Sequence, residues 1–151
     1  MKQIVIFKLG NEEYGIEIMK VVEIVLHQEI RMVPDTPNYI EGIINLRGDI
    51  HPIYNLRTRF NMGDKVADEN TKIIVIRTVE RNIGFIVDSV SEILNIPNAD
   101  IENAPSILNS KADGKYILGV AKYDARMIVL LDIDALVTDR DYKLMDKMVE
   151  E

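Results

Sequence analysis

The chain carries, at residues 14–24, the stretch YGIEIMKVVEI, which returns without a gap as IGFIVDSVSEI at residues 83–93. A second stretch, YIEGI at residues 39–43, returns in the same order as YILGV at residues 116–120. Because the matches keep their order and differ mainly in loop length, they indicate two copies of one small β unit. Residues that this repeat aligns are called repeat mates below. We expect the functional residues at the junction of the two copies.

Short runs rich in β-branched and aromatic residues follow one another along the chain. Residues 3–9 and 14–18 flank a polar turn and are predicted to form a hairpin. Residues 18–26 fit a helix by spacing and a strand by composition, and we favour a turn that leads into a strand at 22–26. Further strands are predicted at 43–46, 49–55, 72–78, 83–88, 92–96, 117–122 and 126–132. Many short strands are typical of barrels rather than of one parallel sheet.

Two longer polar stretches, 61–70 and 105–115, are predicted to be loops, and the first is expected to separate two subdomains. Beyond Asp134, apolar residues are spaced through Asp, Lys and Glu in a way that predicts a C-terminal amphipathic helix. Its apolar residues are Leu136, Val137, Leu144, Met145, Met148 and Val149.

The composition narrows the class of protein. At 151 residues and 47% hydrophobic residues, the chain can fill a core. A net charge of −7 argues against nonspecific binding to nucleic acid or to anionic membranes, so the partner is expected to be a protein. The absence of cysteine excludes disulfides and thiolate metal sites. No stretch is long and apolar enough for a membrane span or a signal peptide, so we expect a cytoplasmic protein that is not inserted into the membrane.

Catalytic arrangements find little support in the sequence. A duplicated β protein could place two carboxylates across a pseudo-twofold axis, as aspartic proteases do. However, the repeat mate of Asp88 is Met19, which leaves no second carboxylate. His27 and His51 have no visible Ser or Asp partner for a nucleophilic triad, and no Gly-rich phosphate loop is present. We therefore predict no catalytic residue and no cofactor.

A metal site is also disfavoured. Asp132 and Asp134, with Asp88 elsewhere, could supply hard oxygen ligands to Mg²⁺ or Ca²⁺. The stronger expectation is that Asp132 and Asp134 close a strand and cap the final helix, where free backbone amides favour Asp.

The tetrapeptide Asn45-Leu46-Arg47-Gly48 is a polar interruption between two apolar runs. As a tight turn it would use Gly48 for positive φ and the side chains of Asn45 and Arg47 for hydrogen bonds. The second copy reads KYDA at residues 122–125, so the fold itself does not demand Arg47, and a structural and a binding role both remain open. Glu23 is the expected ion partner of Arg47, while its repeat mate Glu92 suggests that this acid is partly structural.

The sequence resembles the CheW family of bacterial chemotaxis coupling proteins over nearly its whole length. The motifs that carry the resemblance are YGI at 14–16, VEI at 22–24, VP at 33–34 with Pro37, YIEGIINLRG at 39–48, Pro52, NLR at 55–57, Gly84, VDSV at 87–90 and LLD at 130–132. Two positions depart from the family pattern, because Asn55 stands where Asp is frequent and Ile53 where Val is usual. No role that needs a carboxylate at position 55 is therefore carried over.

The resemblance implies an all-β fold of two intertwined, five-stranded Src-homology-3-like barrels that share a hydrophobic core, with a C-terminal α-helix. We expect one domain over 1–151, with approximate subdomains 15–65 plus the termini and 66–130, and strands exchanged between the barrels. It further implies a non-enzymatic adaptor that bridges methyl-accepting chemotaxis receptors and the regulatory domain of the histidine kinase CheA. Such an adaptor is cytoplasmic and is recruited to membrane receptor arrays.

The resemblance also suggests site residues. The receptor side is carried over to Val21, Glu23, Ile24, Arg47, Val90 and Ile93. The kinase side is expected on the second barrel, around Ile101, Ile117 and Val120. For each Val and Ile, ordinary core packing is the competing interpretation. A helix laid in a groove buries apolar surface but loses rigid-body freedom, so modest affinity is expected.

Three alternatives stay open from the sequence. The first is a regulatory module that senses a small ligand in the groove between the barrels. The second is a fragment of a larger coupling protein that carries a receiver domain. The third and least supported is a hydrolase.

Overall fold

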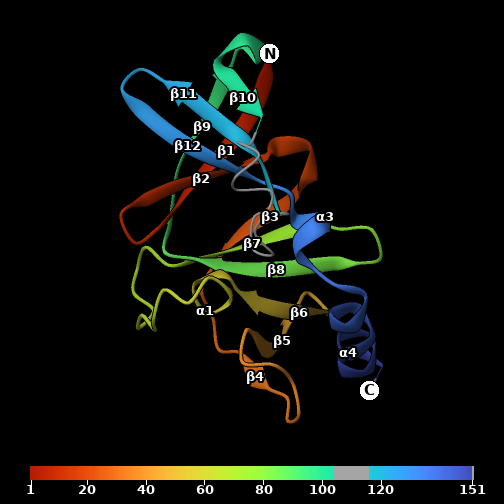
Figure 1. Ribbon diagram of the computed structural model, residues 1–151. Helices are drawn as coiled ribbons and strands as arrows, with labels where there is room; N and C mark the ends of the chain where they lie inside the picture. The colour runs from red at the N-terminus through yellow and green to blue at the C-terminus, as the bar shows by residue number, and fades with distance from the viewer. Residues whose placement is uncertain (104–115, 151) are drawn as a thin grey trace.

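The computed structural model describes residues 1–103 and 116–150, which form two curled six-stranded sheets, one above the other in Figure 1. Sheet A consists, in order across the sheet, of β10 (Ile101–Asn103), β11 (Ile117–Tyr123), β12 (Arg126–Leu131), β2 (Glu12–Glu17), β1 (Lys2–Leu9) and β9 (Ser89–Ile96). Sheet B consists of β3 (Val21–Leu26), β7 (Lys72–Arg77), β8 (Asn82–Val87), β6 (Asp49–Asn55), β5 (Ile40–Leu46) and β4 (Arg31–Met32). The predicted all-β class is thus confirmed.

The two sheets are built alike from repeat mates. When sheet B is read from β4 to β3, each strand is the repeat mate of the strand at the same place in sheet A. Each sheet, however, contains one hairpin that comes from the other copy. The hairpin β1–β2 of the first copy lies in sheet A with β9–β12 of the second, and β7–β8 lies in sheet B with β3–β6. The predicted intertwining is therefore a reciprocal exchange of hairpins.

The register of the strands follows the repeat residue by residue. In the parallel pair β12–β2, Leu130 lies opposite Gly15, and in the parallel pair β6–β8 their mates Ile53 and Gly84 lie opposite each other. A Cβ added at Gly15 would come within 2.5 Å of the Ile4 side chain, and one at Gly84 within 2.7 Å of Ile53. The two glycines of the repeated motif allow the core side chains to cover the strands closely.

The buried side chains of the described residues form three clusters. One lies within sheet A and includes Ile4, Leu94 and Ile128, and one lies within sheet B and includes Ile44 and Ile73. The third, called the shared core below, joins both sheets and the C-terminal helix through Phe7, Leu9, Ile16, Ile40, Tyr54, Leu56, Ile74, Ile76, Ile83, Phe85, Val87, Leu131, Ile133, Leu136, Val137, Tyr142, Met145 and Met148. Each half thus resembles a barrel with its own interior, and the shared core lies between the halves.

Most predicted strands are confirmed, with small differences at their ends. The predicted turn before residue 22 is a 3₁₀ helix, η1 (Ile18–Lys20), and β5 and β9 begin earlier than predicted. The short outer strands β4 and β10 were not predicted, because two or three residues show no periodicity. A second 3₁₀ helix, η2 (Asn98–Asp100), leads into β10. The predicted loop at 105–115 lies outside the described residues.

The subdomain division expected between residues 65 and 66 stays a prediction. The chain between 60 and 71 connects β6 and β7, which both belong to sheet B. The strands of sheet A lie within residues 2–17, 89–103 and 117–131, and those of sheet B lie within residues 21–87. None of the helices in residues 1–103 and 116–150 is long and apolar enough to cross a membrane.

The described residues include three α-helices, one after β6 and two after β12. The short helices α1 (Leu56–Arg59) and α3 (Ile133–Leu136) are equivalent, because the mates Asn55 and Asp132 cap them by accepting backbone N–H groups. The predicted C-terminal helix is confirmed as α4 (Asp139–Val149), capped by Thr138 and Asp141 in a capping box. The prediction that Asp132 and Asp134 cap this last helix was wrong, since a separate turn of helix intervenes.

The helix α4 closes one side of the shared core. Tyr142, Met145 and Met148 are buried in that core, and the helix lies against β5 and β6. Asp141 is also buried and accepts a hydrogen bond of 2.7 Å from the Tyr39 hydroxyl. Burial first, and then this bond, raises the pKa of Tyr39 to about 12, so the hydroxyl stays protonated and able to donate.

We predict that Met145→Ala lowers the free energy of unfolding by about 2–5 kcal/mol, because it removes a fully buried side chain from the shared core. Chemical denaturation followed by circular dichroism measures the loss. The control is Lys143→Ala on the exposed face of the same helix, which should change little. Equal losses in both variants would show that α4 does not pack as described.

Candidate functional site

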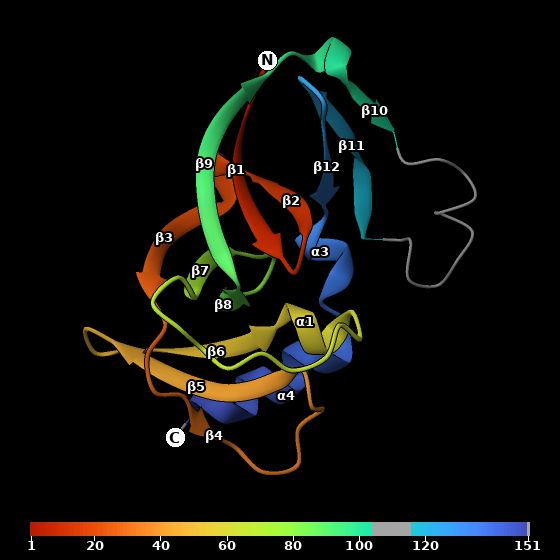
Figure 2. The ribbon, with the colours of Figure 1, turned by 90° about the vertical axis from the view of Figure 1, so that its left-hand side faces the viewer.

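The predicted receptor residues lie mainly on two edge strands, β3 of sheet B and β9 of sheet A. Both strands are drawn at the left of Figure 2. Val21 and its mate Val90 are half-buried against the shared core, whereas Ile24 and its mate Ile93 are 37% and 53% exposed. The two pairs therefore occupy equivalent places, with their valines on a common core and their isoleucines open to solvent.

The strand β3 exposes more apolar surface than the sequence analysis predicted. Val22 and Leu26, 40% and 66% exposed, lie on the same face as Ile24, and Met19 precedes them at 80% exposed. Edge strands with exposed apolar side chains invite association with another chain. The two-residue period of a strand was the signal that could have identified Val22 and Leu26, because it places both on the same face as Ile24.

The turn between β5 and β6 places Arg47 beside β3. Arg47 and Gly48 form the two-residue turn, both with positive φ (52° and 94°), and the Gly48 N–H donates to Asn45 Oδ1 at 2.8 Å. The guanidinium of Arg47 pairs with Glu23 at 2.5 Å, which is the expected ion partner. The Arg47 side chain is 70% exposed, against 28% for Glu23.

The second copy holds a corresponding arginine that the sequence comparison missed. Glu92, the mate of Glu23, accepts a hydrogen bond of 2.9 Å from Arg126, the first residue of β12. Arg126 also donates to both carboxylate oxygens of Glu13, at 2.9 and 2.6 Å. The second copy therefore also places an arginine against this acid, two residues beyond Asp124, the position aligned with Arg47.

The two arginines nevertheless differ in what they leave accessible. Arg126 is 30% exposed and binds two carboxylates, so it braces the end of sheet A. Arg47 is more than twice as exposed and pairs with one carboxylate. Arg47 is consequently the one of the two whose charge a partner could reach.

The predicted kinase residues lie together at the opposite edge of sheet A. Ile101 is on the outer strand β10, and Ile117 and Val120 are on its neighbour β11. All three are half-buried, and Ile101 packs against the core cluster within sheet A. The structure thus places them on one edge, with Ile101 also serving the core.

The carboxylates considered for a metal site are each engaged elsewhere. Asp132 caps α3, Asp88 pairs with Arg57 at 2.6 Å, and Asp134 pairs with Lys20 at 2.5 Å. In residues 1–103 and 116–150, no three His, Cys, Asp or Glu side chains gather closely enough to hold a metal ion. His27 follows β3 and His51 lies on β6.

Two hollows of about 510 and 490 Å³ open beside β4. The first is lined by residues of β4, β5 and the start of β6, and the second also reaches Leu144 and Met148 of α4. Neither is lined by any of the predicted receptor or kinase residues. They give the alternative of a small ligand between the barrels no support.

Comparison with known proteins agrees with this geometry. Residues 3–141 match the family model described as the CheW-like domain. The chain is 38% identical to a protein named Chemotaxis protein CheW from Klebsiella aerogenes, covering 99% of this chain and 89% of that one. It is 32% identical to the protein of the same name from Treponema pallidum, covering 92% and 84%.

Among solved structures, the chain is similar to the scaffolding protein TtCheW from Thermoanaerobacter tengcongensis. The TM-score is 0.84 with 36% sequence identity, over 93% of this chain and 90% of that one.

The hydrogen bonds from Arg126 lower the pKa of Glu13, which predicts a pH dependence. A carboxylate with a lowered folded pKa stabilises the fold above its unfolded pKa near 4.5, and this contribution is lost as pH falls through the folded pKa. We predict that Arg126→Gln lowers the free energy of unfolding by about 1 kcal/mol at pH 7 and by less at pH 3.

Urea denaturation at both pH values measures this difference. The control is Lys122→Gln, since the pair of Lys122 with Glu102 is more than 60% exposed on both sides and should contribute little. An equal loss at pH 7 and pH 3 in Arg126→Gln would contradict the assigned role of Glu13.

Proposed function

The chain belongs to the CheW family, and from that premise we propose that it is a non-enzymatic scaffold that couples methyl-accepting chemotaxis receptors to the histidine kinase CheA. The solved structure that it resembles is named as a scaffolding protein, and its named relatives are chemotaxis proteins. The proposal places the protein in the cytoplasm, recruited to receptor arrays at the membrane.

The receptor is proposed to bind along β3 and β9. The single observation that carries this assignment is the pair of exposed mates Ile24 and Ile93 on two edge strands that share one core. A receptor hairpin tip laid across them would bury apolar surface worth about 25 cal/mol per Å². Part of this gain is offset by the lost rigid-body freedom, so each contact is modest and an array supplies the rest by multivalency.

Arg47 is proposed to contribute charge at the rim of this surface. Its guanidinium is largely exposed while it remains anchored to Glu23. An anchored arginine loses less side-chain entropy on binding than a free one, and it can pair with a carboxylate or a carbonyl of the receptor.

The kinase is proposed to bind the opposite edge of sheet A, at β10 and β11. Ile117 and Val120 are half-buried there, and Leu118 between them is 47% exposed. The regulatory domain of CheA would then contact β10 and β11, which are different strands from the β3 and β9 proposed for the receptor. Separate surfaces are what a coupling protein requires.

No enzymatic step forms part of the proposal. The carboxylates that could have served catalysis are used in caps and ion pairs within the described residues. The relatives are likewise named for chemotaxis and scaffolding.

We predict that Arg47→Ala weakens binding of a receptor hairpin fragment by about tenfold. The free energy lost in binding should exceed the free energy of unfolding lost in the same variant. Arginine and alanine carry the same Cβ at the φ of 52°, so Arg47→Ala leaves the backbone strain unchanged. Arg47→Asn is the second variant, because asparagine favours this conformation and keeps the turn. Isothermal titration measures affinity, and a thermal scan measures stability.

A large loss of melting temperature with unchanged affinity in Arg47→Asn would show that Arg47 only braces its turn. Lys122→Asn serves as the control, because it also removes an exposed cation that pairs with one carboxylate, at a site away from the proposed receptor surface.

We predict that Val120→Arg weakens binding of the CheA regulatory domain by about tenfold and leaves receptor binding unchanged, because it places a charge in the proposed kinase surface. The matched control is Ile43→Arg at its repeat mate, which is half-buried on the equivalent strand of sheet B. Both variants are first checked for folding by circular dichroism. Equal loss of kinase binding in the two variants would refute the assigned surface.

A further inference from the structure

The chain passes from one sheet to the other at two equivalent places. After β2 it crosses from sheet A to sheet B through η1, and after β8 it crosses back at Asp88. The repeat mate of Asp88 is Met19, in the middle of η1. Each crossing leads directly into an edge strand, because β3 begins at Val21 and β9 begins at Ser89.

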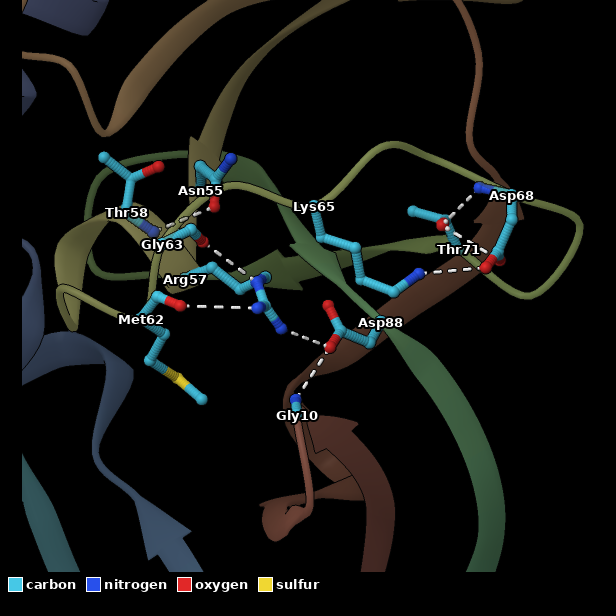
Figure 3. Close-up of polar contacts among 10 residues, drawn as sticks. All are labelled: Gly10, Asn55, Arg57, Thr58, Met62, Gly63, Lys65, Asp68, Thr71 and Asp88. Atoms are coloured by element: carbon cyan, nitrogen blue, oxygen red, sulfur yellow. Dashed lines mark hydrogen bonds and ion pairs between the residues drawn. The ribbon is translucent and has the colours of Figure 1, made fainter.

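The crossing at Asp88 is tied to both sheets by a network shown in Figure 3. Asp88 Oδ2 accepts the Gly10 backbone N–H at 2.7 Å, from the β1–β2 turn of sheet A. The same oxygen pairs with Arg57 Nη1 at 2.6 Å, from α1 beside sheet B. Arg57 also donates to the carbonyls of Gly63 at 3.1 Å and Met62 at 3.3 Å. These bonds hold the guanidinium in one place, and the Arg57 side chain is 19% exposed.

The crossing at η1 is held by an equivalent network, in which the cation lies at the crossing and the carboxylate lies on the helix. Asp134 of α3 accepts a bond of 2.5 Å from Lys20, the last residue of η1. Its other oxygen accepts the backbone N–H of Val79 at 3.2 Å, from the β7–β8 turn of sheet B. The bond to Asp134 raises the pKa of Lys20, so the ammonium stays charged.

The two networks also use residues at equivalent positions of the repeat. Val79 is the repeat mate of Gly10, and Asp134 is the mate of Arg57. In both, a carboxylate accepts a backbone N–H from the equivalent turn and pairs with a cation; the carboxylate lies at the crossing in one and on the helix in the other. The two ion pairs Arg57–Asp88 and Lys20–Asp134 are called the crossing pairs below.

We propose that the crossing pairs are positioning residues that fix the separation of β3 and β9, and thereby the shape of the surface that receives the receptor. Lys20 is adjacent to Val21, and Asp88 is two residues before Val90. A shift at either crossing therefore moves the first residues of an edge strand relative to the opposite sheet. The expected effect on receptor binding rests on the proposed function, whereas the expected effect on the separation of β3 and β9 does not.

The contribution of the crossing pairs to the position of the edge strands can be separated from their contribution to the free energy of unfolding. The shared core joins the two halves without these side chains. The Lys20–Asp134 pair is 43% and 27% exposed, and ion pairs of this kind contribute little to the free energy of unfolding. Its removal should thus leave the protein folded while it releases one crossing.

The separation can be measured in the free protein with two spin labels. The chain contains no cysteine, so Val22→Cys on β3 and Ser91→Cys on β9, close to the first residues of the strands, give two unique attachment sites. These residues are repeat mates and both are exposed. Pulsed electron resonance should give one narrow distance distribution in the parent protein. Lys20→Met and Arg57→Met should each broaden the distribution or shift its maximum by a few ångströms.

Conservative and control variants distinguish positioning from a general loss of structure. Lys20→Arg and Arg57→Lys keep the charge and should retain the narrow distribution. Lys122→Met removes the exposed pair with Glu102 and should change nothing. If Arg57→Met fails to fold, Lys20→Met decides the question, since its more exposed pair can be lost without unfolding.

Receptor binding is then measured on the same variants. Lys20→Met should weaken binding of a receptor hairpin fragment by about tenfold, and Lys20→Arg should restore it. Unchanged distance distributions in folded Lys20→Met would overturn the inference, as would changed distances with unaltered affinity. If the parent protein binds no receptor fragment, the proposed function fails, while the distances still decide whether the crossing pairs set the geometry.

Discussion

The reciprocal exchange of two hairpins is the constraint on which the rest of this structure depends. The hairpin β1–β2 fills the position between β12 and β9 in sheet A, and β7–β8 fills the equivalent position in sheet B. Each sheet would lose its central strands if the other copy were absent. The apolar side chains between the sheets are therefore buried only when both copies fold together, which makes the two halves one cooperative unit.

This arrangement explains why the edges of the sheets are available for partners. The exchanged hairpins fill inner positions of the sheets, and β3 and β9 remain as edge strands that both pack against the shared core. Their half-buried valines attach them firmly, while Ile24 and Ile93 face solvent. A rigid support with a modest exposed apolar surface suits reversible docking, because little backbone has to be ordered on binding. The other edge of sheet A, at β10 and β11, remains for a second partner.

Much of the fold could be predicted from the sequence because the repeat is so regular. The mates Gly15 and Gly84 mark equivalent close contacts, and the strands around them follow with small errors at their ends. The short strand β4 and the helix α1 could not be predicted, because two to four residues carry no periodicity and form through tertiary contacts. The resemblance to the CheW family supplied the site residues, and the structure shows which of them are exposed.

The polar contacts were harder to foresee, for a physical reason. Alignment compares residues at the same position, whereas a long side chain can reach the same acid from a neighbouring position, as Arg126 does for Glu92. Asp134 and Arg57 carry opposite charges at mated positions, so no shared motif connects them. In the first case the two halves share the ion pair but not the position of the arginine, and in the second they share the positions of the contacts but exchange the charges.

The most direct test of this account asks whether one chain holds both partners at once. The isotope-labelled protein is titrated with the CheA regulatory domain, and a receptor hairpin fragment is then added to the complex while amide resonances are followed. The account predicts a ternary complex, with kinase-dependent shifts at β10 and β11 and receptor-dependent shifts at β3, β9 and Arg47. Displacement of one partner by the other, or shifts from both at the same strands, would contradict it.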